Sequence, residues 1–68
     1  MQVFGESIFM VSAEDQDTVG TIKAMVEAQG DIPVTEQVLT YQGQVLRDDQ
    51  TAAECGLKDN ELIMMNRR

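Results

Sequence analysis

The chain has 68 residues, of which 43% are apolar and 25% charged, and its formal net charge is −7. This length corresponds to one domain, which we expect to span residues 1–68. A domain this small buries only about 60% of the surface of its unfolded chain, so a deep catalytic pocket is not expected. The negative charge argues against nucleic acid as a partner, because phosphate backbones require a basic surface.

The residue types that the chain lacks exclude further classes of function. There is no histidine, which removes the commonest general base and a frequent metal ligand. Cys55 is the only cysteine, so an internal disulfide and a cysteine-rich zinc site are both excluded. No apolar run approaches the roughly 20 residues of a membrane span, and the N-terminus lacks the features of a signal peptide. We expect no catalytic residue, metal or cofactor, and a cytoplasmic location with the nucleus as a second compartment.

The first thirteen residues predict a β-hairpin. Two short segments rich in strand-forming residues, "QVFG" and "SIFMVSA", meet at a tight turn around Gly5, Glu6 and Ser7. In the second segment both alternating rows begin with apolar residues. The period of two therefore predicts a strand but does not choose its buried face.

The next segment predicts the one clear helix. Apolar and long side chains recur at helical spacing, at positions Val19, Ile22, Lys23 and Val26. Asp17 or Thr18 is expected to cap its N-terminus, and Gly30 to stop it. Gly20 weakens the helix by about 1 kcal/mol relative to alanine.

The remainder of the chain predicts three more strands. Residues 37–46 form two short strands around a Gln42-Gly43 turn, and residues 62–66 form the last strand. The segment 47–61 is mostly a polar loop with room for one helical turn. The order β-β-α-β-β-turn-β, with one helix on one face of a mixed sheet, is an α+β layout.

Three features permit a structural and a functional interpretation. The acidic loop Glu14–Asp17 lacks the ligand spacing of a calcium loop, so we expect a solvated loop that caps the helix. Cys55 has no basic neighbour in sequence to lower its thiol pKa, so we expect a small buried hydrophobe. Lys23 is either a lysine whose amine reaches water at the edge of the stripe or a buried ammonium held by a carboxylate.

Four segments together resemble ubiquitin: "MQVF", "DTVGTIKAMV", "IPVTEQVLTYQGQVL" and "TAAECGLKDNELIMM". The resemblance covers essentially the whole chain and implies a β-grasp fold. It also implies an inward row made of Phe9, Val11 and Ala13. Lys23 matches a helix lysine that is buried in ubiquitin, and Asp48 matches its carboxylate partner, which implies a structural ion pair.

The departures from ubiquitin imply a domain that is not conjugated. The sequence ends at Asn66-Arg67-Arg68 in place of a Gly-Gly tail, and Gln44 stands where ubiquitin has its main chain-linking lysine. The chain resembles the domains that open proteasome-shuttle proteins, and we expect it to be part of a larger protein. The short first hairpin and "LIMM" are most similar to the DNA-damage-inducible shuttle family, whose aspartyl protease domain lies downstream. "ECGLKDNEL" is similar to the excision-repair shuttle family, the second candidate.

The last strand suggests where a partner binds. If Leu62 and Met64 point at the helix, Ile63 and Met65 point away from it, and an uncovered apolar patch usually marks an interaction site. The expected partner-binding residues are Gln2, Phe4, Val38, Thr40, Val45, Ile63 and Met65. Against this, isolated surface apolar residues are ordinary, or another domain of the parent protein covers the patch.

The resemblance implies a partner for this patch, although Thr40 stands where ubiquitin has its central isoleucine. We expect a monomeric binding module that docks on ubiquitin or on a ubiquitin-receptor subunit of the proteasome. The alternative is a regulatory domain that contacts a downstream protease or ubiquitin-binding domain of its own protein.

Overall fold

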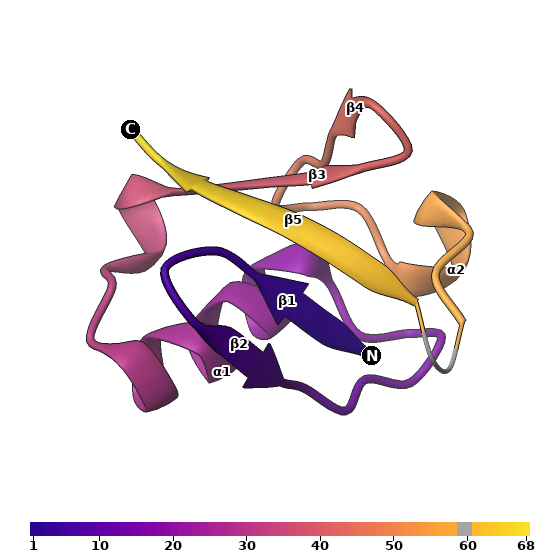
Figure 1. The fold of residues 1–68 in the computed structure, drawn as a ribbon. Coiled ribbons are helices and arrows are strands. Elements are labelled where there is room, and N and C mark those ends of the chain that lie inside the picture. Colours follow the sequence, from indigo (N-terminus) through magenta and orange to yellow (C-terminus); the bar gives the residue numbers. More distant parts are fainter. Residues whose placement is uncertain (59–60) are drawn as a thin grey trace.

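The computed structural model describes residues 1–58 and 61–68 of the chain. Its strands and helices, in chain order, are β1 (Gln2–Phe4), β2 (Ile8–Met10), α1 (Val19–Gly30), the 3₁₀ turn η1 (Val34–Glu36), β3 (Gln37–Tyr41), β4 (Gln44–Val45), α2 (Ala52–Cys55) and β5 (Leu62–Arg67). The strands form one sheet in the order β2-β1-β5-β3-β4 (Figure 1). The predicted order of elements and the α+β, β-grasp layout are confirmed.

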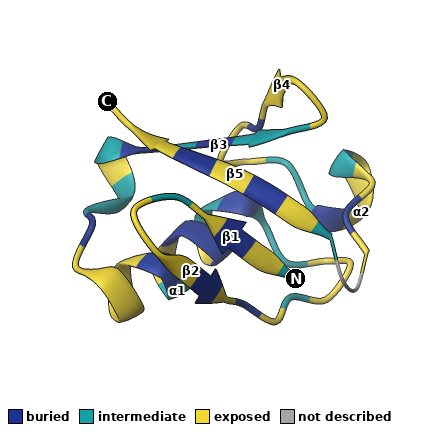
Figure 2. Cartoon of the chain, in the orientation of Figure 1, coloured by how far each residue is buried: buried dark blue, intermediate teal, exposed yellow. Residues whose placement is uncertain are grey.

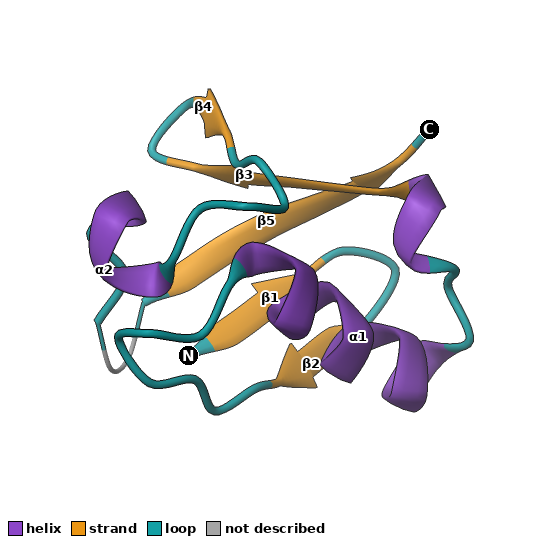
Figure 3. Cartoon of the chain, turned by 180° about the vertical axis from the view of Figure 1, so that it is seen from behind, coloured by secondary structure: helices purple, strands orange, loops and turns teal. Residues whose placement is uncertain are grey.

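The last strand lies at the centre of the sheet. β5 runs parallel to β1 and antiparallel to β3, so the C-terminal segment joins the two hairpins. Helix α1 packs across one face of this sheet (Figure 3). Both edges are short strands, β2 and β4.

The β1–β2 hairpin turns in three residues, 5–7. The Gly5 N–H donates to the Ser7 carbonyl at 3.0 Å, and beyond the strands the Val11 N–H donates to the Met1 carbonyl at 3.0 Å. Glycine is favoured at position 5 because an added Cβ would lie 3.0 Å from the Met65 carbonyl oxygen and would displace Cε of Met65, which lies 2.7 Å away. The predicted tight turn is therefore present, and its glycine allows the loop to lie against β5.

The ends of α1 are defined by two capping residues. Of the two predicted N-caps, Thr18 is used, since its hydroxyl accepts from the Thr21 N–H at 3.3 Å. The helix ends at Gly30 as predicted, but Asp31 adopts the left-handed conformation, with φ 58°. Gly30 serves a different purpose, because a Cβ there would lie 2.6 Å from the ring of Phe9.

The β3–β4 hairpin has the two-residue turn that its sequence predicts. Gln42 and Gly43 both have positive φ, 51° and 83°. Positive φ at both central residues is typical of a type I′ turn, whose twist matches that of the paired strands. The turn fixes the pairing of Tyr41 with Gln44.

The segment after β4 contains α2, which begins at a complete capping box. The Thr51 hydroxyl accepts from the Glu54 N–H at 3.2 Å, and the Glu54 carboxylate accepts from the Thr51 N–H at 2.9 Å. Gly56, with φ 76°, ends the turn in the left-handed conformation. The sequence predicted only a polar loop with room for one turn here, although Thr51 and Glu54 have the spacing of a capping box. Residues 59 and 60 of that predicted loop lie outside the described residues.

The core lies between α1 and the inner face of the sheet. It comprises Val3, Phe9, Val11, Val19, Ile22, Val26, Ile32, Leu39, Leu46, Ala52, Leu57, Ile63 and Met65. Phe9 and Val11 are buried and Ala13 packs against the core, so the predicted inward row is confirmed. Buried and exposed residues alternate along β5 (Figure 2). One face of the sheet therefore belongs to the core and the other does not.

Candidate functional site

The structure reverses the predicted orientation of β5. Ile63 and Met65 are 0% and 4% exposed and belong to the core, whereas Leu62 and Met64 are 50% and 46% exposed. The prediction that Ile63 and Met65 lie on the outer face is wrong. Ile63 is the register partner of Val3, which is itself fully buried, so both must face α1.

The outer side of the sheet carries a row of side chains that crosses every strand. In the register of the sheet, Ile8 pairs with Phe4, Phe4 with Met64, Met64 with Thr40, and Thr40 with Val45. Paired residues share a face. We call these five residues the cross-strand row. It spans four strand spacings, about 19 Å at about 4.8 Å each, and Thr40 is its only polar member.

Two shorter rows flank the cross-strand row on the same side. One is Met10, Gln2 and Leu62, and the other is Asn66 and Val38. Together the three rows form what we call the open face. Figure 1 views the sheet from this side, and no helix of the described residues crosses it.

The exposed large apolar side chains of the described residues all lie on the open face. They are Phe4, Ile8, Met10, Val45, Leu62 and Met64, with exposed fractions between 43% and 64%. A single exposed apolar residue is ordinary, but six on one side of a 68-residue chain form a contiguous patch of the kind that marks an interaction site.

Five of the predicted site residues lie on the open face and two do not. Gln2, Phe4, Val38, Thr40 and Val45 are there. The wrongly placed pair is replaced by its neighbours on β5, Leu62 and Met64.

Sequence reasoning also missed Ile8 and Met10. The inward row of Phe9 and Val11 contained the signal, because alternation along a strand then turns Ile8 and Met10 outward.

The open face itself carries no charged side chain. None of its ten residues is ionisable, although the chain has twelve acidic residues. Next to Asn66, the Arg67 guanidinium bonds Glu36 at 3.0 Å and Glu6 at 3.2 Å. These two carboxylates raise the pKa of Arg67, Glu36 more than Glu6. The face therefore offers an uncharged apolar centre with ion-paired side chains at one end.

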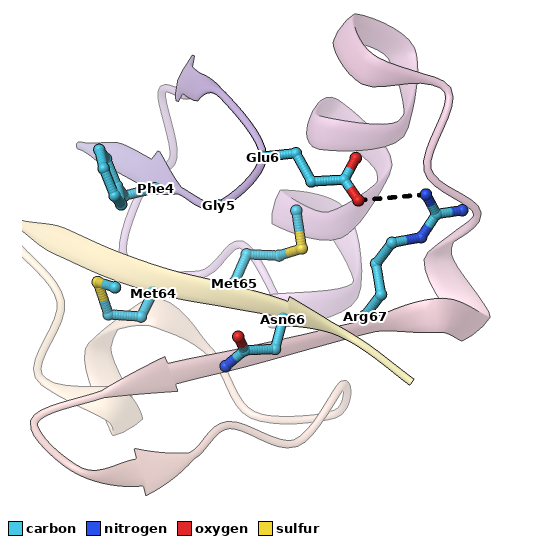
Figure 4. Close-up of a pocket in the computed structure, with 7 residues that line it drawn as sticks. All are labelled: Phe4, Gly5, Glu6, Met64, Met65, Asn66 and Arg67. Carbon is cyan, nitrogen blue, oxygen red and sulfur yellow. Dashed lines mark hydrogen bonds and ion pairs between the residues drawn. The ribbon is translucent and has the colours of Figure 1, made fainter.

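A depression of about 350 Å³ lies where the open face meets the β1–β2 loop. It is lined by Phe4, Gly5, Glu6, Met64, Met65, Asn66 and Arg67. Figure 4 shows Phe4 and Met64 at one end, and the ion pair of Glu6 and Arg67 at the other. The depression is open to solvent, so it suits a side chain of a partner better than an enclosed small molecule.

The expected ion pair lies away from the open face. Nζ of Lys23 is 2.6 Å from Oδ1 of Asp48, and the Lys23 side chain is 5% exposed. Asp48 is 60% exposed, so the expectation that both partners are largely buried holds for Lys23 only. The Gln37 amide supports this region by donating to the Lys23 carbonyl at 2.8 Å. The pair joins α1 to the segment that follows β4.

Cys55 is half-buried and packs against the core. Burial raises the pKa of its thiol, and the nearby Glu54 carboxylate raises it further. A raised pKa disfavours the thiolate, which is the reactive form. Among residues 1–58 and 61–68, no cluster of three metal-ligating side chains is found, and no helix is long and apolar enough to cross a membrane.

Comparison with known proteins agrees with this architecture. The sequence model of the Ubiquitin family matches residues 2–68. Protein DNA-DAMAGE INDUCIBLE 1 of Arabidopsis thaliana is 33% identical over 61 residues, which is 90% of this chain and 15% of the relative. Ubiquitin domain-containing protein DSK2b of the same plant is 37% identical over 59 residues, which is 87% of this chain and 11% of the relative. UV excision repair protein rhp23 of Schizosaccharomyces pombe is 32% identical over 57 residues, which is 82% of this chain and 16% of the relative.

The similarity thus covers nearly all of this chain but only 11% to 16% of the length of these relatives. The family match, the β-grasp sheet order and the packing of helix α1 on one face agree with one another. The chain therefore belongs to the ubiquitin family.

Proposed function

We propose that the chain is a non-conjugated binding module that docks through its open face on ubiquitin or on a ubiquitin-receptor subunit of the proteasome. The observation that carries this proposal is the gathering of all six exposed large apolar side chains of the described residues on that face. Burying such side chains contributes about 25 cal/mol per Å² of apolar area, offset by the cost of association. The face is therefore the part of the molecule with the most to gain from a partner.

The charge of the chain favours a partner with a basic rim. The open face is uncharged, while the chain as a whole carries −7. The apolar centre of such a partner would match the uncharged open face, and basic residues around that centre would be attracted by the net negative charge of the chain. Such attraction raises the association rate more than the affinity and weakens as salt is added.

The relatives support a role in ubiquitin-dependent processes. They include a ubiquitin domain-containing protein and a UV excision repair protein. We place any aspartyl protease activity of the parent protein outside these residues, because the Asp-Ser/Thr-Gly motif is absent from the sequence. The chain itself would contribute binding.

A titration tests the proposal directly. ¹⁵N-labelled chain is mixed with increasing ubiquitin, and in a second series with a purified proteasomal ubiquitin receptor, and amide shifts are followed by NMR. We expect shifts on β1, β5 and β3, and weaker binding in Met64→Ala. Glu27→Ala is the matched control, because it truncates an exposed side chain of similar length on α1. Shifts confined to α1 or to residues 14–17 would refute docking through the open face.

The second candidate is a regulatory domain that uses the same face within its own protein. It is favoured by the small share of the relatives that this chain spans, 11% to 16%, which leaves room for a domain that covers the face. The test compares the spectrum of the isolated chain with that of the longer parent protein. If the open-face amides of the longer protein are shifted relative to those of the isolated chain, and the longer protein binds ubiquitin more weakly, this candidate is favoured over the first.

A further inference from the structure

The methionines of the chain are sorted between the two faces of the sheet. Met10 and Met64 lie on the open face and are 62% and 46% exposed. Met65 is 4% exposed, and Met1 and Met25 are partly buried against the core. Only two of the five methionines are therefore exposed to the solvent.

Met64 and Met65 form a natural matched pair, because they are neighbours on β5 that point to opposite faces. Met65 packs beneath the β1–β2 loop, where its Cε would lie 2.7 Å from a Cβ at Gly5. Met64 lies in the middle of the cross-strand row, between Phe4 on β1 and Thr40 on β3. In Figure 4 the two thioethers are seen on different sides of the strand. Both residues lie in the same strand and differ in burial, so a difference in reactivity between them reports exposure.

We propose that Met10 and Met64 are a reversible oxidation site on the open face, with hydrogen peroxide or an organic peroxide as the oxidant. In the reaction the thioether sulfur attacks the terminal O–H oxygen of the peroxide, an S–O bond forms, the O–O bond breaks, and the proton of the attacked oxygen moves to the departing oxygen. The sulfur is oxidised to the sulfoxide, and the peroxide is reduced to water or an alcohol. Both sulfurs lie outside the core, so the oxidised chain keeps its fold.

Oxidation changes the chemistry of the open face. A sulfoxide is polar and carries a strong acceptor oxygen, whereas the thioether is apolar and adaptable. At Met64 this oxygen would stand in the centre of the cross-strand row, beside Phe4. At Met10 it would stand in the flanking row, beside Gln2. Methionine sulfoxide reductases reverse the change, so the site can act as a switch.

The effect on binding rests on the proposed function. A partner that covers Met64 would have to bury the sulfoxide oxygen without a hydrogen bond, or rearrange. We expect the doubly oxidised chain to bind ubiquitin about tenfold more weakly, a loss typical of one disrupted central contact. Reduction of the sulfoxides should restore the affinity.

The modification site is tested without any partner. The folded chain is treated with hydrogen peroxide, and samples are cleaved with trypsin, which releases residues 59–67 with Met64 and Met65 in one peptide. Tandem mass spectrometry then separates the two. We expect oxidation at Met64 well ahead of Met65, and at Met10 ahead of Met1, with the NMR spectrum of the core unchanged. Equal rates at Met64 and Met65, or loss of the native spectrum, would overturn the inference.

The switch is tested with ubiquitin and a resistant variant. Met10→Leu combined with Met64→Leu keeps the face apolar and removes both sulfurs. We expect peroxide to weaken ubiquitin binding by the unmutated chain, and to leave this variant at the affinity that it has before treatment. If the untreated, unmutated chain does not bind ubiquitin, the proposed partner is wrong. The order in which the methionines are oxidised still shows whether Met10 and Met64 form the oxidation site. If the parent binds equally well before and after oxidation, the switch is refuted.

Discussion

Val3 and Ile63 are register partners in the parallel pairing of β1 with β5, and both side chains are completely buried. This relationship determines which residues of the sheet belong to the core. Because alternation turns successive side chains to opposite faces, it sends Phe4, Leu62 and Met64 to the open face. The candidate binding surface therefore depends on one packing contact at the centre of the sheet.

Truncation of single side chains on β5 should lower the free energy of unfolding by different amounts on its two faces. We expect Ile63→Ala to lower the free energy of unfolding by about 2–5 kcal/mol, because it leaves a cavity against α1. Leu62→Ala, on the open face, should cost less than about 1 kcal/mol. Urea denaturation followed by circular dichroism measures both.

A domain this small could be unfolded by Ile63→Ala, so Ile63→Val provides a milder companion, with an expected cost of about 0.5–1.5 kcal/mol. If Leu62→Ala proved more damaging than either Ile63 variant, the assignment of faces on β5 would be wrong. The same variants link stability to function, because only the Leu62 variant should weaken partner binding in a fully folded chain.

The Lys23–Asp48 pair should show an asymmetric response to mutation. Asp48→Ala leaves a buried ammonium without its carboxylate, and we expect a cost of about 1–3 kcal/mol. This is less than for a fully buried pair, because Asp48 is 60% exposed and water can replace it in part. Lys23→Met fills the same space without a charge and should be nearly neutral, alone or combined with Asp48→Ala. Thermal melts of the three variants measure these effects. If Asp48→Ala melted at the same temperature as the unmutated chain, the ammonium of Lys23 would not depend on its carboxylate partner.

The capping box of α2 should make stability depend on acid pH. Hydrogen bonds from the backbone and the side chain of Thr51 lower the pKa of Glu54 below its ordinary value. Since the folded pKa is the lower one, Glu54 stabilises the fold above its unfolded pKa of about 4.3, and the stabilisation is lost as pH falls through the folded pKa. Urea midpoints of the parent and Glu54→Gln should therefore differ at neutral pH and converge in acid. A difference that stays constant down to the lowest pH would rule out the carboxylate as its source.

The elements that could be predicted are those whose sequence pattern favours one structure over the alternatives. The α1 stripe, the Gln42-Gly43 turn and the succession of strands and helix along the chain each had a local signal that agreed with the structure. The run from Leu62 to Met65 had none, because four apolar residues in succession satisfy either face. Its orientation is fixed by Val3, a residue about sixty positions away. No local sequence pattern indicates that contact.

Other features were available in the sequence but needed a second step. The spacing of Thr51 and Glu54 indicates a capping box, and an inward Phe9 already places Ile8 outside. The left-handed Asp31 is different in kind. A glycine would ordinarily take that conformation, but Gly30 lies within the helix, where an added Cβ would meet the Phe9 ring. The glycine thus serves a tertiary contact, and the local sequence does not indicate this.

The two helical glycines should respond in opposite directions to the same substitution. Alanine in place of glycine stabilises a protein by about 0.4–1 kcal/mol where the native backbone accepts it without strain. At Gly20 an added Cβ would have its nearest neighbour, the Asp48 carbonyl, at 3.5 Å, which is an ordinary contact. At Gly30 it would meet the Phe9 ring at 2.6 Å, so the ring or the end of α1 would have to move. We therefore expect Gly20→Ala to raise the urea midpoint and Gly30→Ala to lower it. Because Phe9 lies directly beneath Gly30, Phe9→Leu should reduce the penalty of Gly30→Ala in a double-variant cycle. Equal stabilisation by both alanines would mean that the Phe9 ring yields freely, and that Gly30 is not needed for the packing of α1 on β2.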